Sequence, residues 1–196
     1  MTSLLAAIVG YLLGSIPFGV LAAKRQGRDI LHEGSCNPGA TNALRVMGPY
    51  WAALVLIGDA GKGLLAAYLG WKLGGPLGSA LAGAAAALGH AYSIYLRGRG
   101  GKVVAVSLGV LLFWGWPLVV GALVVFGVVI ALTRIVSVSS MLAALAAAVL
   151  AAAGMPALPP SLRYAVFFLV LLLLWRHRPN IERLLRHEEK RLGSHG

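Results

Sequence analysis

Long apolar segments, interrupted by short loops that carry most of the charge, constrain this chain more than any other feature of its sequence. Of the 196 residues, 59% are hydrophobic and only 12% are charged, which is about half the charged fraction of an average soluble domain. A chain of this length cannot bury so much apolar surface in a water-soluble core. We therefore expect a lipid bilayer to be its solvent.

Seven segments are apolar enough to predict membrane helices, which need about 20 such residues, or fewer where a helix ends in an interface or a cavity. They run roughly over residues 3–23, 50–72, 76–96, 103–114, 116–133, 138–154 and 161–176. We expect an all-α integral membrane protein with seven transmembrane helices, folded as a single membrane-embedded domain over residues 1–196. The fourth and fifth segments could instead form one long broken helix, because only a compact turn at residues 114–117 separates them.

The basic residues predict the orientation of these helices. Lys and Arg collect in the cytoplasmic loops of membrane proteins. If the first helix starts outside, all but three of the 17 basic residues lie on the cytoplasmic side, the exceptions being Lys62, Lys72 and Arg163. We therefore predict an outside N-terminus and a cytoplasmic C-terminus. The net charge of +11 also raises the question of nucleic-acid binding, but no basic helix or aromatic platform accompanies it, so we expect no nucleic-acid partner.

The predicted cytoplasmic loops hold two segments suited to binding phosphate. Residues 34–45 read GSCNPGATNALR, where glycines can turn N–H groups toward an anion, Ser, Thr and Asn add short donors, and Arg45 supplies a planar guanidinium. Residues 97–102 read RGRGGK and open a helix, whose free N–H groups favour phosphate with Lys102 as counter-charge. The alternatives are an ordinary surface turn for the first segment and a basic interfacial turn for the second, which lacks Walker A spacing.

Isolated polar residues lie within the predicted spans or next to their ends. Asp59 and Lys62 are three residues apart within the second span, so they share a helix face and predict a structural ion pair, with direct catalysis as the alternative. His90 lies near the inner end of the third span. His177 and Asn180 begin a basic amphipathic tail, whose simplest role is docking on the membrane surface. Either histidine could act as a base, although a lone histidine is more often structural.

Taken together, these motifs resemble the bacterial acyl-phosphate:glycerol-3-phosphate acyltransferase family, commonly called PlsY. The resemblance follows the order of the chain over nearly its whole length. It rests on residues 14–19 (GSIPFG), the loop 34–45, residues 59–63 (DAGKG), Gly89-His90, residues 100–102 with Ala105 and Gly109, Ser137 with Ser140, and residues 176–184 (RHRPNIERL).

The resemblance implies a seven-helix enzyme of the bacterial inner membrane with its active site on the cytoplasmic side. It implies transfer of a fatty acyl group from acyl phosphate to the 1-hydroxyl of glycerol 3-phosphate, giving 1-acylglycerol 3-phosphate and phosphate, the first step of phospholipid synthesis. It also implies no metal, no cofactor and no direct use of coenzyme A or acyl carrier protein, and we infer no obligate protein partner.

The resemblance further implies roles for particular residues. The expected catalytic residues are Ser35, Arg45, Lys102 and His177; the expected substrate-binding residues are Asn37, Thr41, Asn42, Gly100, Gly101, Ser140 and Asn180; and Asp59, Lys62 and His90 are expected to support the site structurally.

Four positions depart from the usual pattern of this family. Cys36, Val103 and His187 stand where glycine is usual, and Val106 replaces a threonine. The two valines remove flexibility and a hydroxyl beside the phosphate loop, but no departure removes a charge from the expected site. Cys36 is the single cysteine, so it forms no intrachain disulfide, and we expect a small loop residue rather than a nucleophile.

The sequence leaves three chemical routes open and suggests three other classes of protein as alternatives. The donor phosphate could accept the hydroxyl proton, His177 could act as general base, or Ser35 could form a covalent acyl intermediate.

Acyltransferases that use thioesters carry an Asp five residues after a His, but Tyr95 occupies that position after His90. A transporter for an organic phosphate would need polar residues on both faces, and a scaffold would not need polar inner loops.

Overall fold

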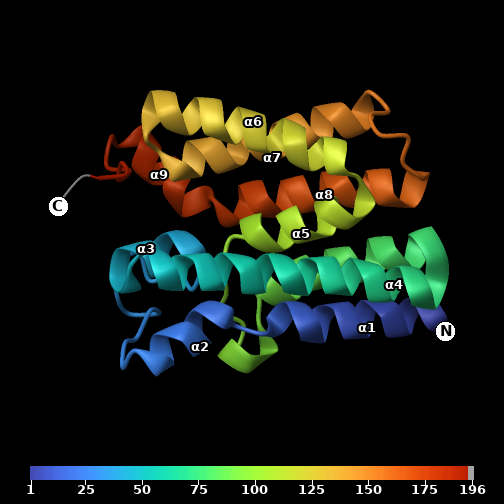
Figure 1. The fold of residues 1–196 in the computed structure, drawn as a ribbon, viewed down its shortest axis with the longest axis horizontal. Coiled ribbons are helices and arrows are strands. Elements are labelled where there is room, and N and C mark those ends of the chain that lie inside the picture. The colour runs from blue at the N-terminus through green and yellow to red at the C-terminus, as the bar shows by residue number, and fades with distance from the viewer. Residues whose placement is uncertain (194–196) are drawn as a thin grey trace.

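The computed structural model describes residues 1–193, and every regular element in that part of the chain is helical. The elements are α1 (Thr2–Ser15), α2 (Phe18–Arg25), α3 (Ala40–Met47), α4 (Pro49–Ala91), the 3-10 turn η1 (Ile94–Leu96), α5 (Val104–Trp114), α6 (Trp116–Thr133), α7 (Val136–Ala152), α8 (Pro160–Arg176) and α9 (Arg178–Leu185). The long helices pack side by side along one axis, with the N-terminus at one end and α9 at the other (Figure 1).

Three helical stretches of the described chain are long and apolar enough to cross a membrane. They are Thr2–Arg25, Pro49–Leu96 and Trp116–Thr133; α8 and α9 also pass this test together, across a bend of 51°. Helices α5 and α7 are apolar but shorter. Length and composition alone therefore give three or four spans, fewer than the seven predicted, because one stretch is folded back on itself and two helices are short.

Helix α4 contains a fold-back between the two predicted helices 50–72 and 76–96. Gly74 and Gly75 have non-helical backbone angles inside it, with φ of +58° at Gly75, and Pro76 follows. A residue with a side chain rarely adopts such a positive φ, whereas glycine does so at little cost. The chain reverses there (Figure 1), which confirms the break between the predicted helices 50–72 and 76–96. The second ends at Ala91, earlier than predicted.

The predicted first helix, 3–23, is wrong as a single element, because the structure divides it into α1 and α2. Helix α1 ends at Ser15, and Ile16 and Pro17 have non-helical angles. Proline has no N–H to donate, and it disfavours helical geometry at the residue before it. The freed carbonyl of Ile16 accepts a hydrogen bond from Lys62 Nζ at 2.6 Å. The break is therefore held by a side chain from α4.

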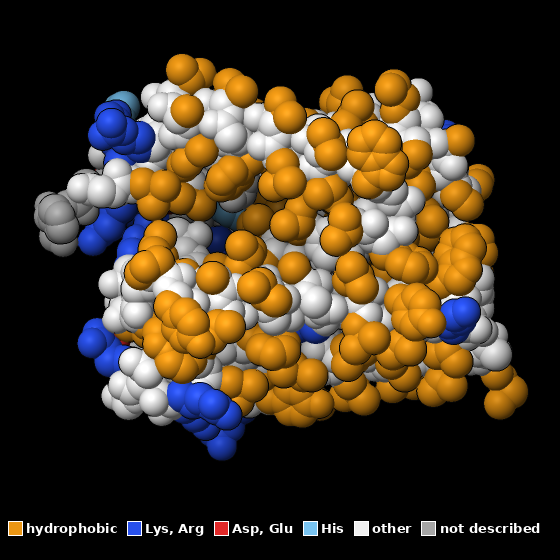
Figure 2. All heavy atoms as spheres, viewed as in Figure 1, with side chains coloured by type: hydrophobic (Ala, Val, Ile, Leu, Met, Phe, Trp, Pro, Cys, Tyr) orange, Lys and Arg blue, Asp and Glu red, His pale blue; other side chains and the backbone are white. Residues whose placement is uncertain are grey.

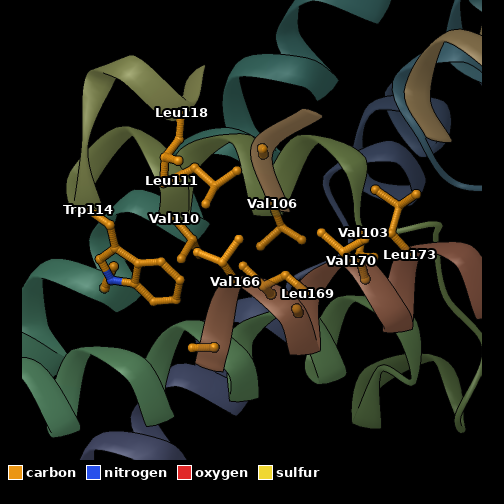
Figure 3. Close-up of a cluster of buried hydrophobic side chains, with 14 of the residues drawn as sticks. Val103, Val106, Val110, Leu111, Trp114, Leu118, Val166, Leu169, Val170 and Leu173 are labelled. Atoms are coloured by element: carbon orange, nitrogen blue, oxygen red, sulfur yellow. The ribbon is translucent and has the colours of Figure 1, made fainter. Parts of the chain in front are cut away.

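The other predicted boundaries agree with the structure to within two residues. The alternative of one long helix over residues 103–133 is wrong, since Gly115 has an extended backbone and separates α5 from α6. A dry core forms where α5 meets α8 (Figure 3). Its labelled side chains include Val106 and Val110 on one helix and Val166 and Leu169 on the other.

The surface separates apolar from basic side chains. Hydrophobic side chains cover the flank of the bundle, whereas most visible Lys and Arg gather at the end that carries α2, α3 and α9 (Figure 2). A flank of this kind suits lipid, and basic ends suit the cytoplasmic side of a bilayer. The distribution agrees with the asymmetry predicted from the sequence.

Helix α1 approaches the second part of α4 closely through glycines. A Cβ atom added to Gly14 would overlap the backbone of Ala86, and one added to Gly10 would overlap that of Ala82. Small residues at such contacts allow helix backbones to pack tightly in lipid. The contact fixes the position of α1 and, through it, the Ile16 carbonyl that binds Lys62.

We expect Gly14→Ala to lower the free energy of unfolding by about 1–3 kcal/mol, because the added methyl group must push two backbones apart. Gly127→Ala in α6 is the matched control, since a Cβ there meets no atom within 4 Å. Thermal unfolding in one detergent measures both variants. Equal melting temperatures for the two variants would contradict the close contact.

Candidate active site

A cavity of about 680 Å³ opens near the basic end of the bundle. It is bounded by the loop before α3, by α4, by the start of α5, by α7, and by the junction of α8 with α9 and the tail that follows. Most residues predicted for the site line it, namely Ser35, Asn37, Thr41, Asn42, Arg45, Asp59, His90, Lys102, Ser140, His177 and Asn180. Residues separated by more than a hundred positions in the sequence therefore converge on one cavity.

Lys62 does not line this cavity but holds one of its walls. Its Nζ lies 2.7 Å from Asp59 Oδ1, and His90 Nδ1 lies 3.6 Å from the same oxygen. All three side chains are buried. The predicted ion pair is therefore present, and its remaining hydrogen bond reaches the break between α1 and α2. This arrangement fits the structural role expected for the three residues.

Gly100 and Gly101 also do not line this cavity. The Gly101 N–H donates to the His90 carbonyl at 2.9 Å, so it is not free to bind a phosphate as the sequence suggested. The carbonyl oxygens of Gly100 and Gly101 accept hydrogen bonds from the Arg176 guanidinium at 2.9 and 3.0 Å. The two glycine carbonyls thus fasten the loop between α4 and α5 to Arg176 at the end of α8. This places the next residue, Lys102, in the cavity.

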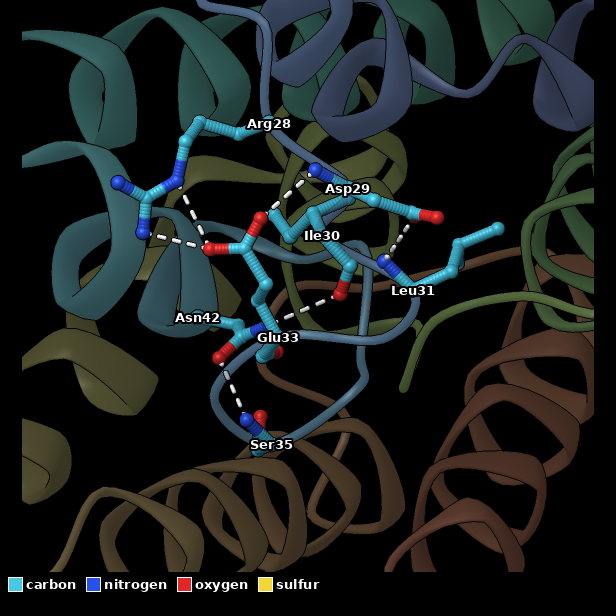
Figure 4. Close-up of polar contacts among 7 residues, drawn as sticks. All are labelled: Arg28, Asp29, Ile30, Leu31, Glu33, Ser35 and Asn42. Carbon is cyan, nitrogen blue, oxygen red and sulfur yellow. Dashed lines mark hydrogen bonds and ion pairs between the residues drawn. The ribbon is translucent and has the colours of Figure 1, made fainter.

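Asn42 organises the first loop (Figure 4). Its Oδ1 accepts the Ser35 N–H at 2.7 Å, and its Nδ2 donates to the carbonyls of Ile30 and Glu33 at 3.2 and 2.9 Å. Asn42 is buried, and its amide is engaged by the loop itself. The structure thus gives it a supporting role where substrate binding was expected. It presents Ser35, whose hydroxyl makes no hydrogen bond within residues 1–193.

The loop in front of Ser35 is held by acidic residues that the sequence analysis did not identify. Glu33 accepts hydrogen bonds from Arg28 Nε and from the Asp29 N–H, both at 2.8 Å (Figure 4). Asp29 Oδ1 in turn accepts the Leu31 N–H at 3.1 Å. The sequence signal that could have identified them is the spacing of Asp29 and Glu33, two acidic residues four positions apart in a glycine-containing loop.

Two cations that line the cavity have no ion-pair partner in the described part of the chain. Among the described residues, Arg45 and Lys102 make no side-chain hydrogen bond or ion pair. Burial lowers the pKa of Lys102 to about 8; Glu189 opposes this shift, while Arg183, Arg45 and Arg176 lower the pKa further. Cations that crowd one another without carboxylate partners form a site for an anion.

His177 faces the cavity with a defined tautomer. Its Nδ1 lies 2.8 Å from the Leu173 carbonyl oxygen, which can only accept, so Nδ1 carries the hydrogen and Nε2 is left as an acceptor. Burial lowers the pKa of His177 to about 4, and the charge of Lys102 lowers it as well. The imidazole is therefore neutral at pH 7. Ser140 is less available, since its hydroxyl donates to the Val136 carbonyl within α7 at 2.8 Å.

Three of the four departures from the family pattern have left-handed backbones. Cys36, Val103 and His187 have φ of +55°, +58° and +59°, which explains why glycine suits these positions. The buried Val103 offsets this strain by packing in the core (Figure 3). The fourth departure, Val106, is also buried in that core and does not line the cavity.

We expect Cys36→Gly to raise the free energy of unfolding by up to about 1 kcal/mol, because glycine relieves the strain at this exposed position. Cys36→Ala is the matched control, since it removes the thiol but keeps the Cβ. Chemical denaturation in detergent measures both. A gain in the alanine variant equal to that in the glycine variant would show that strain is not the cause.

Known proteins match this chain over almost its entire length. The sequence model of a family described as glycerol-3-phosphate acyltransferase matches residues 4–187. A glycerol-3-phosphate acyltransferase of Carboxydothermus hydrogenoformans is 40% identical over 192 residues, covering 97% of each chain. One of Synechococcus sp. strain JA-2-3B'a(2-13) is 48% identical over 200 residues, covering 99% of this chain and 96% of the relative.

Two solved structures share the fold. They are crystal structures of PlsY (YgiH), an integral membrane glycerol 3-phosphate acyltransferase, in a glycerol 3-phosphate form and a lysophosphatidic acid form. Their TM-scores are 0.92 and 0.89, both at 34% identity over 98% of this chain and 96% of the other. These matches confirm the prediction of an all-helical integral membrane protein, and they show that the chain belongs to the glycerol-3-phosphate acyltransferase family.

Proposed function

We propose that this protein transfers a fatty acyl group from acyl phosphate to the 1-hydroxyl of glycerol 3-phosphate, releasing 1-acylglycerol 3-phosphate and phosphate. Its family, and the substrate and product forms of the related PlsY structures, support the acyl acceptor and the product. The observation in this chain that supports it most is the pair of cations without counter-ions, Arg45 and Lys102, in one cavity with hydroxyl and amide donors.

The cavity is amphipathic, as both substrates of such a reaction require. Arg45, Lys102 and the polar loop line it together with apolar side chains such as Leu56 of α4 and Phe126 of α6. A phosphate would be bound by the cations, and a hydrocarbon chain would lie against the apolar walls. We propose that the acyl chain extends from there between the helices toward the bilayer.

The same geometry supports acyl phosphate as the donor. When the acceptor hydroxyl attacks the acyl carbonyl, an ester C–O bond forms and the C–O bond to phosphate breaks. The negative charge on the leaving phosphate is stabilised by Lys102 and Arg45, which stand ready without rearrangement. Ser35, Asn37 and Thr41 would orient the two phosphates, and alignment of the hydroxyl with the carbonyl would supply much of the rate.

We propose that the donor phosphate, rather than His177, accepts the hydroxyl proton. Burial and the charge of Lys102 disfavour an imidazolium at His177, and a base works best when its pKa lies near the working pH. The bare Nε2 can still accept a hydrogen bond from the hydroxyl and orient it. A covalent acyl-Ser35 is not required, because the donor is already activated.

We propose seven spans in a single membrane-embedded domain, with the N-terminus outside and the cavity open to the cytoplasmic side of a bacterial inner membrane. The seven would be α1, the two parts of α4, and α5 to α8. The fold-back at Gly74 and Gly75 and the opposite ends occupied by the N-terminus and α9 support this topology (Figure 1). The positively charged end supports its orientation.

Cys36 provides a direct test of that topology, since it is the only cysteine and lines the cavity. A membrane-impermeant maleimide should label Cys36 in inside-out vesicles but not in sealed right-side-out ones. Added glycerol 3-phosphate should slow the labelling. Fast labelling from the outside would contradict the proposed orientation.

The activity is tested with purified protein, a long-chain acyl phosphate and radiolabelled glycerol 3-phosphate, with coenzyme A omitted. We expect labelled lysophosphatidate and an equal amount of inorganic phosphate. Acyl coenzyme A in place of acyl phosphate is the matched control and should give no product. Product from the thioester alone would exclude the proposed donor while leaving the family assignment intact.

The pKa of Lys102 predicts the pH dependence of substrate binding. The Lys102 side chain binds phosphate only as the protonated ammonium, and its pKa is about 8. The KM for glycerol 3-phosphate should therefore be nearly constant from pH 7 to just below that value and rise roughly tenfold per pH unit above it. Lys102→Arg should remove this rise, because guanidinium stays protonated. An equal rise in both proteins would assign the titration to another group.

A further inference from the structure

Glu189, in the tail that follows α9, lies in the cavity although its neighbours are exposed. Its side chain is only 8% exposed. One carboxylate oxygen, Oε1, accepts hydrogen bonds from Ser137 Oγ at 2.7 Å and from Asn180 Nδ2 at 2.6 Å, and Oε2 accepts one from Arg183 Nε at 2.8 Å. A carboxylate with three donors is firmly held, and it joins α7 to α9 across one wall of the cavity.

The backbone of the tail is fastened on both sides of this contact. The Glu188 N–H donates to the Arg183 carbonyl at 2.8 Å, and the Leu192 N–H donates to the Arg134 carbonyl at 2.7 Å. The left-handed backbone of His187 turns the chain at the end of α9. The backbone hydrogen bonds on both sides of Glu189 therefore fix the position of its side chain in the cavity.

We propose that Glu189 is a positioning residue of the acyl-transfer site. Its carboxylate fixes Asn180 and Arg183 against Ser137, and its negative charge offsets the repulsion among the cations that bind the substrate phosphates. The proposal rests on the function proposed above. Nothing in the sequence motifs assigned Glu189 to the site.

Charged groups of several elements lie in and around the cavity with Glu189, and its neighbours Glu188 and Lys190 also line it. Lys102 precedes α5, Arg45 lies on α3, Arg176 and His177 end α8, and Arg183 lies on α9. Removing the Glu189 carboxylate would leave Arg183 without an ion partner in the described chain.

The pKa values follow from this arrangement. Burial raises the pKa of Glu189, but the hydrogen bonds from Asn180, Ser137 and Arg183 outweigh it and hold the pKa below its usual value, so the carboxylate is charged at neutral pH. That charge raises the pKa of Lys102 against the effects of burial and the nearby arginines. Neutralising Glu189 should therefore lower the pKa of Lys102, and the cation would be lost at a lower pH.

A competing explanation is that Glu189 imitates a substrate phosphate and holds the tail in a self-inhibited position. In that case glycerol 3-phosphate would have to displace it. The structure favours positioning, because Arg45 and Lys102 remain without ion partners while Glu189 is paired with Arg183. The two explanations predict opposite effects on affinity.

The test is Glu189→Gln, which keeps the size of the side chain but removes its charge. We expect the Kd and KM for glycerol 3-phosphate at pH 7 to rise roughly tenfold, in line with the loss of a charge-assisted contact. The midpoint of the alkaline rise in KM, meaning the pH at which half of the Lys102 side chains have lost their proton, should move down by about half a pH unit or more. A purely structural role would not move that midpoint. Glu182→Gln on exposed α9 surface is the control and should change neither quantity.

Glu189→Asp separates charge from position and guards against misfolding of the first variant. It keeps the charge, so the alkaline midpoint should stay close to that of the wild type, while its shorter reach should still lower kcat/KM. Unchanged binding and an unchanged midpoint in Glu189→Gln would overturn the proposal, and so would tighter binding. Calorimetric binding of glycerol 3-phosphate needs no turnover, so failure of the acyl-phosphate reaction would be recognised separately.

Discussion

Two cations without counter-ions, Arg45 and Lys102, are the feature on which the rest of the site depends. A charge removed from water is costly unless it is paired, and two enclosed carboxylates of the described chain have cationic partners. Asp59 neutralises Lys62, and Glu189 binds Arg183. In the cavity, the partly buried Lys102 and the exposed Arg45 have no ion partner among the described residues. A doubly charged phosphate supplies the missing anion, so binding stabilises both the ligand and the protein.

The fold brings these cations together by interrupting its helices. The break at Pro17 exposes a carbonyl for Lys62, whose ion pair with Asp59 supports the wall beside His90. The glycines that end the loop before α5 are fastened to Arg176 and leave Lys102 directed into the cavity. In a membrane, backbone groups freed at such breaks need partners from within the protein. Irregular backbone and polar chemistry are therefore found at the same places.

Much of this could be predicted from the sequence, because apolar length, basic asymmetry and short motifs are local signals. The reversal at Gly74 and Gly75 was visible from the glycines and the proline that follows. The division of the first helix was not predicted, although Pro17 is a known helix breaker. The apolar residues on both sides of Pro17 suggested one continuous helix. The roles of Asn42 and Gly101 depend on partners that only the folded loop brings near.

Glu189 shows why the remaining part of the site could not be predicted. Its partner Ser137 lies 52 residues away, and a single acidic residue in a basic tail has no periodicity or motif. The positive φ values at Cys36, Val103 and His187 could likewise not be predicted from a local sequence pattern. The replacement of glycine at these positions is visible in the sequence, but the backbone conformation that explains the pattern is a property of the structure.

The most direct test of the account is the affinity of the purified protein for glycerol 3-phosphate after both Arg45 and Lys102 are replaced by glutamine. We predict that this double variant, while still folded, binds glycerol 3-phosphate no more tightly than it binds glycerol, because the charge that attracts the phosphate is gone. The wild type should prefer glycerol 3-phosphate strongly, and salt should weaken that preference. Wild-type affinity in the double variant would contradict the account.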